Sequence, residues 1–124
     1  MENLVIEKTK VTPSINFNAV SGEMEIAGES YPENSMQFYQ PVFKWLTEFF
    51  EQASGGCVFN FKLQYFNTSS SKCILNILEI LEDANNGGKT VTLNWYYQED
   101  DEDMLESGQE FGEDMTLPFN YISY

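Results

Sequence analysis

Residues 57–97 read CVFNFKLQYFNTSSSKCILNILEILEDANNGGKTVTLNWYY, and this stretch contains two alternating apolar patterns with a helical pattern between them. The alternation of apolar and polar residues over 57–66 and over 90–97 predicts two strands. Between them, apolar residues recur at helical spacing until Asn86-Gly87-Gly88, which predicts a helix that ends there. A strand, a helix and a strand with short connections form a βαβ unit, so the two strands should be parallel.

The alternation also predicts how the sheet is covered. Parallel strands buried on both faces usually read as continuous apolar runs, whereas these strands alternate. We therefore expect helices mainly on one face of the sheet and an open second face. The predicted apolar face of the strand over 57–66 consists of Cys57, Phe59, Phe61, Leu63 and Tyr65.

The rest of the chain supplies further elements around this unit. The predicted elements are a short strand over 4–8, a hairpin of strands 14–18 and 23–28 with its turn at 20–22, a helix from Asn34 or Ser35 to about Ala53, a helix over about 101–111 and a last strand over 117–122. Together they predict a single α/β domain over residues 1–124, with a mixed sheet and an N-terminal hairpin.

The first helix contains two features that the sequence leaves open. Pro41 is unfavourable inside a helix, so we expect a separate first turn and a main segment that begins at Pro41. Tyr39, Phe43 and Phe50 form a second apolar stripe that either extends the core or is partly exposed. Ser54-Gly55-Gly56 should end this helix.

Composition excludes several classes of function. The net charge of −14 argues against nucleic acid and anionic membranes as partners, since either needs a basic surface. No apolar run reaches the roughly 18 residues that a membrane-spanning helix needs, and Met1-Glu2-Asn3 does not begin a signal peptide, so we expect a cytoplasmic protein. The two cysteines should be buried, reduced thiols. Without histidine, Ser-His nucleophile pairs and His-based metal sites are excluded, and we expect no metal and no cofactor.

Four consecutive hydroxyl residues, Thr68 to Ser71, stand between the strand and the second helix, and Lys72 follows them. Any of Asn67, Thr68, Ser69 or Ser70 can cap the helix, but one cap leaves a surplus of hydroxyls. A phosphate at a helix N-terminus would add roughly −1.5 to −2 charges beside free N–H groups. A phosphorylation switch is therefore one explanation of the surplus hydroxyls, in addition to their role in capping the helix. The acidic run Glu99–Asp103, by contrast, indicates a solvated loop that leads into a helix.

Two segments of the sequence resemble the SiaC family of bacterial regulatory phosphoproteins. They are Gly28-Glu29-Ser30-Tyr31-Pro32-Glu33-Asn34-Ser35 and Leu63-Gln64-Tyr65-Phe66-Asn67-Thr68-Ser69-Ser70-Ser71-Lys72. The acidic Phe111-Gly112-Glu113-Asp114 followed by Leu117-Pro118-Phe119 resembles that family's C-terminal segment. The similarity spans essentially the whole chain.

The resemblance implies a fold like that of anti-sigma-factor antagonists, the STAS-type α/β domain. It also implies a non-catalytic switch. By this resemblance, we expect a partner serine/threonine kinase to phosphorylate Thr68 and a PP2C-like phosphatase to remove the phosphate. The resemblance further implies that the unphosphorylated form binds and activates a diguanylate cyclase, which would connect the switch to cyclic di-GMP and biofilm regulation.

The other residues of the two segments have expected roles beside Thr68. We expect Asn67, Ser69 and Ser70 to shape the loop and cap the helix, and Lys72 to offset the phosphate charge. Partner binding is assigned to a surface near Thr68, formed by Tyr31, Pro32, Glu33, Asn34, Ser35 and Tyr65. Two alternatives remain open: a scaffold that works without phosphorylation, and a small enzyme that uses a hydroxyl of the 68–71 cluster as nucleophile.

Overall fold

The computed structural model describes residues 1–53 and 55–124. Within these residues the chain forms β1 (Leu4–Ile6), β2 (Ser14–Phe17), β3 (Glu23–Ser30), α1 (Ser35–Gln52), β4 (Cys57–Phe66), α2 (Thr68–Asn86), β5 (Val91–Tyr97), α3 (Glu102–Glu113) and β6 (Phe119–Ser123). Every predicted element is present, with bounds that differ by a few residues. No helix in the described part of the chain is long and apolar enough to cross a membrane.

The six strands form one sheet in the order β1-β2-β3-β4-β5-β6. The first three strands pair in antiparallel fashion, which confirms the predicted N-terminal hairpin. From β3 to β6 all neighbours are parallel, and each parallel connection contains one helix. The mixed α/β class and the predicted parallel pairing of β4 with β5 are therefore confirmed.

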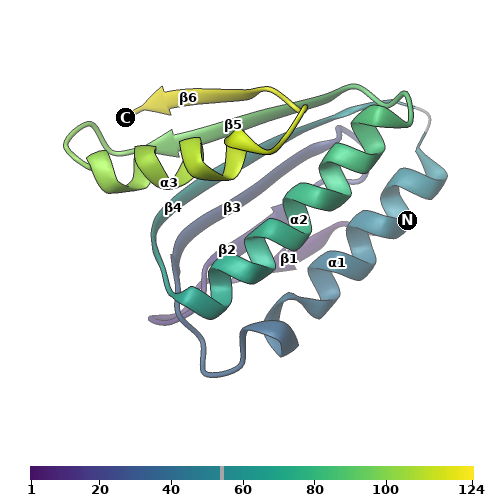
Figure 1. Cartoon of the computed structure of the whole chain (residues 1–124). Coiled ribbons are helices and arrows are strands. Elements are labelled where there is room, and N and C mark those ends of the chain that lie inside the picture. The colour runs from purple at the N-terminus through teal and green to yellow at the C-terminus, as the bar shows by residue number, and fades with distance from the viewer. Residues whose placement is uncertain (54) are drawn as a thin grey trace.

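All three helices lie on the same face of the sheet, as Figure 1 shows, and α1 and α2 run side by side across it. The core between the sheet and the helices is apolar, and its fully buried side chains include Ile15, Phe17, Met24, Ile26, Tyr39, Val42, Leu46, Phe59, Phe61, Ile74, Ile77, Leu78, Leu81 and Leu93. The expectation of helices mainly on one face is confirmed.

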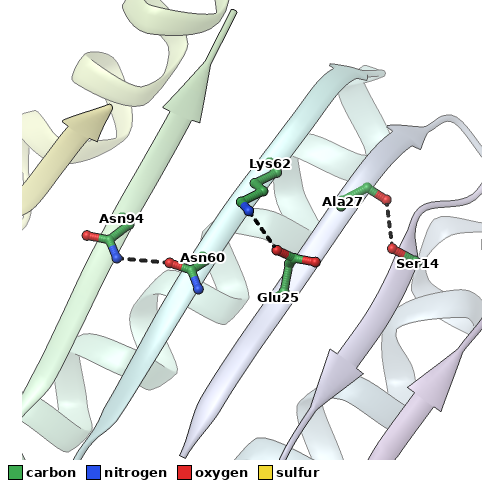
Figure 2. A network of polar contacts seen from close by, with 6 residues as sticks. All are labelled: Ser14, Glu25, Ala27, Asn60, Lys62 and Asn94. Carbon is green, nitrogen blue, oxygen red and sulfur yellow. Dashed lines mark hydrogen bonds and ion pairs between the residues drawn. The ribbon is translucent and has the colours of Figure 1, made fainter. Parts of the chain in front are cut away.

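The opposite face of the sheet carries polar side chains that bind one another across the strands (Figure 2). Asn94 Nδ2 donates to Asn60 Oδ1 at 2.9 Å, and Asn120 Nδ2 donates to Asn94 Oδ1 at 3.1 Å. Lys62 Nζ lies 3.0 Å from a carboxylate oxygen of Glu25 on the neighbouring strand. These contacts explain the alternation in the sequence, because this side of each strand needs no apolar cover.

Helix α1 corrects one expectation and settles another. It is continuous from Ser35 to Gln52, so Pro41 lies inside it and does not start a separate segment. Pro41 and Gln37, whose carbonyl loses its helical donor, are both exposed, so water can replace the missing bond. In the second apolar stripe, Tyr39 is fully buried while Phe43 and Phe50 are partly buried against the core.

A β-bulge near the end of β4 corrects the predicted orientation of Tyr65. Leu63 pairs with Gly28 and Tyr65 pairs with Glu29, so Gln64 is an extra residue on β4. The bulge reverses the alternation. Phe66 packs against the core beside Phe111 of α3, and Tyr65, expected on the apolar face, is instead 50% exposed.

The remaining local expectations are met where the structure describes them. Helix α2 ends at Asn86 with Gly87 as its C-cap. Both cysteines are buried and free, and burial raises the pKa of Cys57 to about 12. Of the predicted stop at 54–56, Ser54 lies outside the described residues. The acidic run leads into α3, where the Asp101 side chain accepts a hydrogen bond from the Met104 N–H at 3.0 Å.

Glu82 of α2 fixes the loop that leads from α3 into β6. Its carboxylate accepts hydrogen bonds from the backbone N–H of Thr116, from the Thr116 hydroxyl at 3.0 Å and from the Leu117 N–H at 3.2 Å. The bonds from the backbone of Leu117, and then those from Thr116, hold the pKa of Glu82 below its ordinary value.

We expect Glu82→Gln to lower the free energy of unfolding at pH 7, because the hydrogen bonds from Thr116 and Leu117 are stronger to a carboxylate than to a neutral amide. Solvent weakens these bonds at this surface position, so the loss should be only roughly 1 kcal/mol. Since the folded pKa is depressed, the stabilisation is present above the unfolded pKa and is lost as the pH falls through the folded pKa. Urea unfolding over a series of pH values from 7 downward measures it: wild type and variant should differ at pH 7, and the difference should shrink as the Glu82 carboxylate becomes protonated. The exposed Glu79, changed to Gln, is the control. A difference that does not shrink with falling pH while the chain is still folded would contradict this account.

Candidate functional site

The carboxyl ends of the parallel strands share one edge of the sheet, and the helices begin there (Figure 1). Asn34 caps α1 by accepting from the Gln37 N–H at 3.1 Å, and Asn67 caps α2 by accepting from the Ser70 N–H at 2.9 Å. Asparagine is a preferred cap because its side-chain oxygen satisfies an N–H that the helix leaves free. Both conspicuous sequence segments therefore end at this edge, each as the start of a helix.

The two segments are hydrogen-bonded to each other. Ser35 Oγ lies 2.7 Å from Ser69 Oγ, and Ser30 Oγ donates to Ser70 Oγ at 2.8 Å. The Asn67 N–H also donates to the Ser30 carbonyl at 3.0 Å. The structure thus brings together residues more than 30 positions apart in the sequence.

The four consecutive hydroxyls are not equivalent. Ser70 is fully buried and bonded to Ser30, and the Ser69 hydroxyl contacts both Ser35 and the Asn67 side chain. Ser71 is half-buried. Thr68 is the first residue of α2 and is exposed, and its side chain makes no hydrogen bond to any other described residue. Of the hydroxyls at this helix start, Thr68 alone combines exposure with an unused hydrogen-bonding capacity.

The start of α2 suits an added negative charge. Its first turn contains no acidic residue, and the N-terminal N–H groups and the helix dipole favour an anion there. Lys72 is exposed one turn along the helix. A phosphate on Thr68 would meet these groups without being buried.

The surface next to Thr68 is partly aromatic. The Tyr31 and Tyr65 rings make an edge-to-face contact with their centroids 5.8 Å apart, and they are 38% and 50% exposed. Pro32, which follows Tyr31 in the loop, is buried, while Glu33 is exposed. Exposed tyrosines that pack on each other offer rigid contact area of the kind common in protein interfaces.

Two open hollows flank the start of α2. One, of about 700 Å³, is lined by Glu33, Asn34, Ser35, Met36, Gln37, Phe38 and Ser69. The other, of about 350 Å³, is lined by Gln64, Tyr65, Phe66, Asp101, Asp103, Met104 and Ser107. The predicted site residues thus lie in or beside this edge, with Lys72 exposed one turn further along α2.

Sequence reasoning missed two residues of this edge, Ser30 and Tyr39. Tyr39 is buried with its hydroxyl 2.7 Å from Ser30 Oγ, and burial raises the pKa of Tyr39 to about 12. Ser30 lies inside the first segment, but its sequence does not show that its side chain points inward. Among the described residues, no group of three or more potential metal ligands is clustered.

Comparisons with known proteins match nearly the whole chain. Over residues 6–124 the chain matches the family model described as SiaC family regulatory phosphoprotein. It is 37% identical over 119 residues to an uncharacterized protein of Pseudomonas aeruginosa strain UCBPP-PA14, covering 96% of this chain and 94% of that protein.

Solved structures from Pseudomonas aeruginosa are similar as well. The crystal structure of apo-SiaC superposes with a TM-score of 0.92 at 36% identity, covering 98% of this chain and 99% of that one. A chain in the crystal structure of diguanylate cyclase SiaD in complex with its activator SiaC gives a TM-score of 0.93 at 36% identity, with the same coverage.

Proposed function

The chain belongs to the SiaC family of regulatory phosphoproteins, and from this premise we propose that it is a cytoplasmic activator of a diguanylate cyclase, controlled by phosphorylation of Thr68. The observation that carries the proposal is the position of the Thr68 hydroxyl, which is exposed and makes no hydrogen bond to the described residues. The similar SiaC of Pseudomonas aeruginosa forms a complex with the cyclase that it activates.

Phosphorylation requires a kinase in trans. The γ-phosphoryl group of ATP passes to Thr68 Oγ1: the bond between the γ-phosphorus and the bridging oxygen breaks, ADP leaves, and the hydroxyl proton is released. A PP2C-like phosphatase reverses the switch by directing water onto the phosphorus, which returns the hydroxyl and inorganic phosphate. Incubation of the chain with magnesium and ATP alone should therefore give no phosphothreonine by mass spectrometry. Labelling without a kinase would contradict this part of the proposal.

The added charge would act on the Tyr31–Tyr65 surface. A cyclase that docks there must approach the start of α2, where the phosphate would have to be desolvated or paired. Ser69 and Ser70 shape the loop of the unphosphorylated chain, and Lys72 partly offsets the phosphate charge.

Two substitutions at Thr68 test the switch. We expect Thr68→Asp to weaken binding of the cyclase by about tenfold or more, because the carboxylate places a permanent charge in the interface. Thr68→Ala should bind within about threefold of wild type and resist phosphorylation, since the hydroxyl makes no internal bond that the fold needs. Isothermal titration against the cyclase, with cyclic di-GMP production as a second readout, measures both.

Ser21→Asp is the matched control, because Ser21 is exposed in the hairpin turn at the opposite edge of the sheet. It should leave binding unchanged. A pull-down with the Thr68→Ala chain as bait identifies the cyclase in the native host. If neither Thr68 variant alters binding, the chain is a phosphorylation-independent scaffold. Turnover of a small molecule that Thr68→Ala abolishes would instead reveal an enzyme.

A further inference from the structure

Six side chains form a continuous hydrogen-bonded chain at the start of α1 and α2, here called the hydroxyl chain. Its members are Tyr39, Ser30, Ser70, Ser35, Ser69 and Asn67. The successive contacts measure 2.7 Å, 2.8 Å, 3.2 Å, 2.7 Å and 3.2 Å. Its first four members are buried, so these hydroxyls cannot turn to water for replacement partners.

Each hydroxyl has only one proton to donate, so the geometry fixes which side chain is the donor in every contact of the hydroxyl chain. Ser30 donates to Ser70, so its contact with Tyr39 must be donated by Tyr39. At the other end Ser69 donates to the Asn67 side-chain oxygen, so Ser35 must donate to Ser69.

The remaining contact, between Ser70 and Ser35, must then be donated by Ser70, because the Ser35 proton is already used. Every donor thus points toward Asn67 Oδ1. That oxygen also accepts the Ser70 N–H and caps α2. The high pKa of the Tyr39 hydroxyl keeps it protonated, as a first donor must be.

The hydroxyl chain connects the residue before Thr68 with the other conspicuous loop. Asn67 directly precedes Thr68, while Ser30 precedes Tyr31 and Ser35 is the first residue of α1. The loop from Tyr31 to Asn34 is therefore held between two members of the chain.

We propose that the hydroxyl chain transmits the phosphorylation state of Thr68 to the loop over 31–34, so that both segments of the docking surface change together. This inference rests on the proposed phosphorylation of Thr68. Phosphate oxygens are stronger acceptors than the Asn67 amide oxygen and would compete with it for the Ser70 N–H and the Ser69 hydroxyl. Once Ser69 turns away, Ser35 loses its acceptor, and buried Ser70 and Ser30 must reorient in turn.

The test needs no partner protein. Phosphothreonine is installed at position 68 during synthesis of the chain, and amide ¹H–¹⁵N spectra of the phosphorylated and unphosphorylated chains are compared. In the wild-type sequence we expect shift changes over 67–71 and also over 30–36. Changes confined to 67–71 would overturn the proposal.

Ser35→Ala tests the path, because it removes the link between Ser70 and Ser69 while leaving Thr68 and Asn67 in place. The changes over 67–71 should persist, and those over 30–34 should fall by about threefold or more if the link is severed. Ser35→Thr, which retains a hydroxyl, should restore them. Equal changes over 30–34 in wild type and in Ser35→Ala would overturn the proposal.

Two further variants keep the test decisive. Ser14→Ala removes a hydroxyl on the open face of the sheet that donates to the Ala27 carbonyl, drawn in Figure 2, and should leave the pattern unchanged. Tyr39→Phe removes only the first donor, so changes at 38–40 should vanish while those at 30–35 remain. Loss of the 30–35 changes in this variant, or persistence of those at 38–40, would overturn the proposed order, in which the change passes along the hydroxyl chain to Ser30 first and to Tyr39 last.

These outcomes are separable from those of the proposed function. If phosphorylation left cyclase binding unchanged but shifted residues 30–36, the proposed switch would fail and the hydroxyl chain would stand. If phosphorylation weakened binding with shifts confined to 67–71, the reverse would hold.

Discussion

Replacing Gly108 by alanine should lower the free energy of unfolding by about 2–3 kcal/mol, although alanine is the better helix former by about 1 kcal/mol. A Cβ at this position would lie 2.6 Å from two ring atoms of Trp95. That ring is 1% exposed, and its Nε1 donates to the Met104 carbonyl at 2.9 Å. Because the ring packs against Phe61, Phe111 and Phe119, it cannot move aside without disturbing the sheet.

Two other glycines supply graded controls for this expectation. At Gly112 a Cβ would meet the Tyr121 hydroxyl, the far end of a side chain that can shift at the cost of weakening its hydrogen bond to the Gly108 carbonyl, so Gly112→Ala should cost only about 1 kcal/mol. A Cβ on Gly55 would have no neighbour within 4 Å, and that substitution should be nearly neutral. Urea unfolding of the three variants checks the order. Equal effects at Gly108 and Gly112 would contradict the close packing of α3 on Trp95.

Replacing Phe59 by alanine should cost about 3–5 kcal/mol, the largest effect of any substitution considered, because it removes a large buried ring and leaves a cavity. Phe59 lies in β4, is fully buried, and contacts Phe17 and Phe61 with centroid distances of 5.4 Å and 4.7 Å. Since small domains are stable by only about 5–15 kcal/mol, this loss would shift the urea midpoint strongly.

The matched control for Phe59 is Phe43→Ala, the same truncation at a partly buried position of α1. Its cost should be clearly smaller than that at Phe59, since part of the Phe43 side chain already contacts water and its removal leaves no enclosed cavity. Similar losses of stability at both positions would contradict the expectation that the fully buried Phe59 of β4 contributes more to the core than the partly buried Phe43 of α1. Both variants are compared by urea unfolding at 25 °C.

Much of the fold was predictable because its strongest signals are local. Alternation over 57–66 and 90–97, with a helical pattern between, was enough to predict parallel strands and helices on one face. The orientation of Tyr65 was not predictable, because the bulge at Gln64 depends on how β4 pairs with Gly28 and Glu29, far away in the sequence. Pro41 was misread for a related reason: packing of Val42, Trp45 and Leu46 outweighs the hydrogen bond that Pro41 removes.

The candidate site, too, could be predicted only in part from the sequence. A capped helix start with surplus hydroxyls at 67–71 could be read from the sequence, and the structure places Asn67 as the cap. Which hydroxyls are already bonded could not be read, because the partners of Ser69 and Ser70 are Ser35 and Ser30, at separations of 34 and 40 residues. Tyr39 joins them because α1 brings its hydroxyl within 2.7 Å of Ser30 at the end of β3. The assignment of Thr68 as phosphate acceptor remains a prediction.

The extra residue in β4 has a consequence for how such proteins diverge. Up to Leu63 the strand is in phase with the core, and after Gln64 it is one step out of phase. The exposed pair Tyr31 and Tyr65 can therefore be exchanged for other side chains without altering the packing of Phe61 or Leu63. Deleting Gln64 would remove the bulge and still leave Tyr65 outward and Phe66 inward, because Tyr65 would then directly follow the inward-facing Leu63. Evolution is thus free to vary the chemistry of this rim, and the length of the strand that leads to it by this one residue.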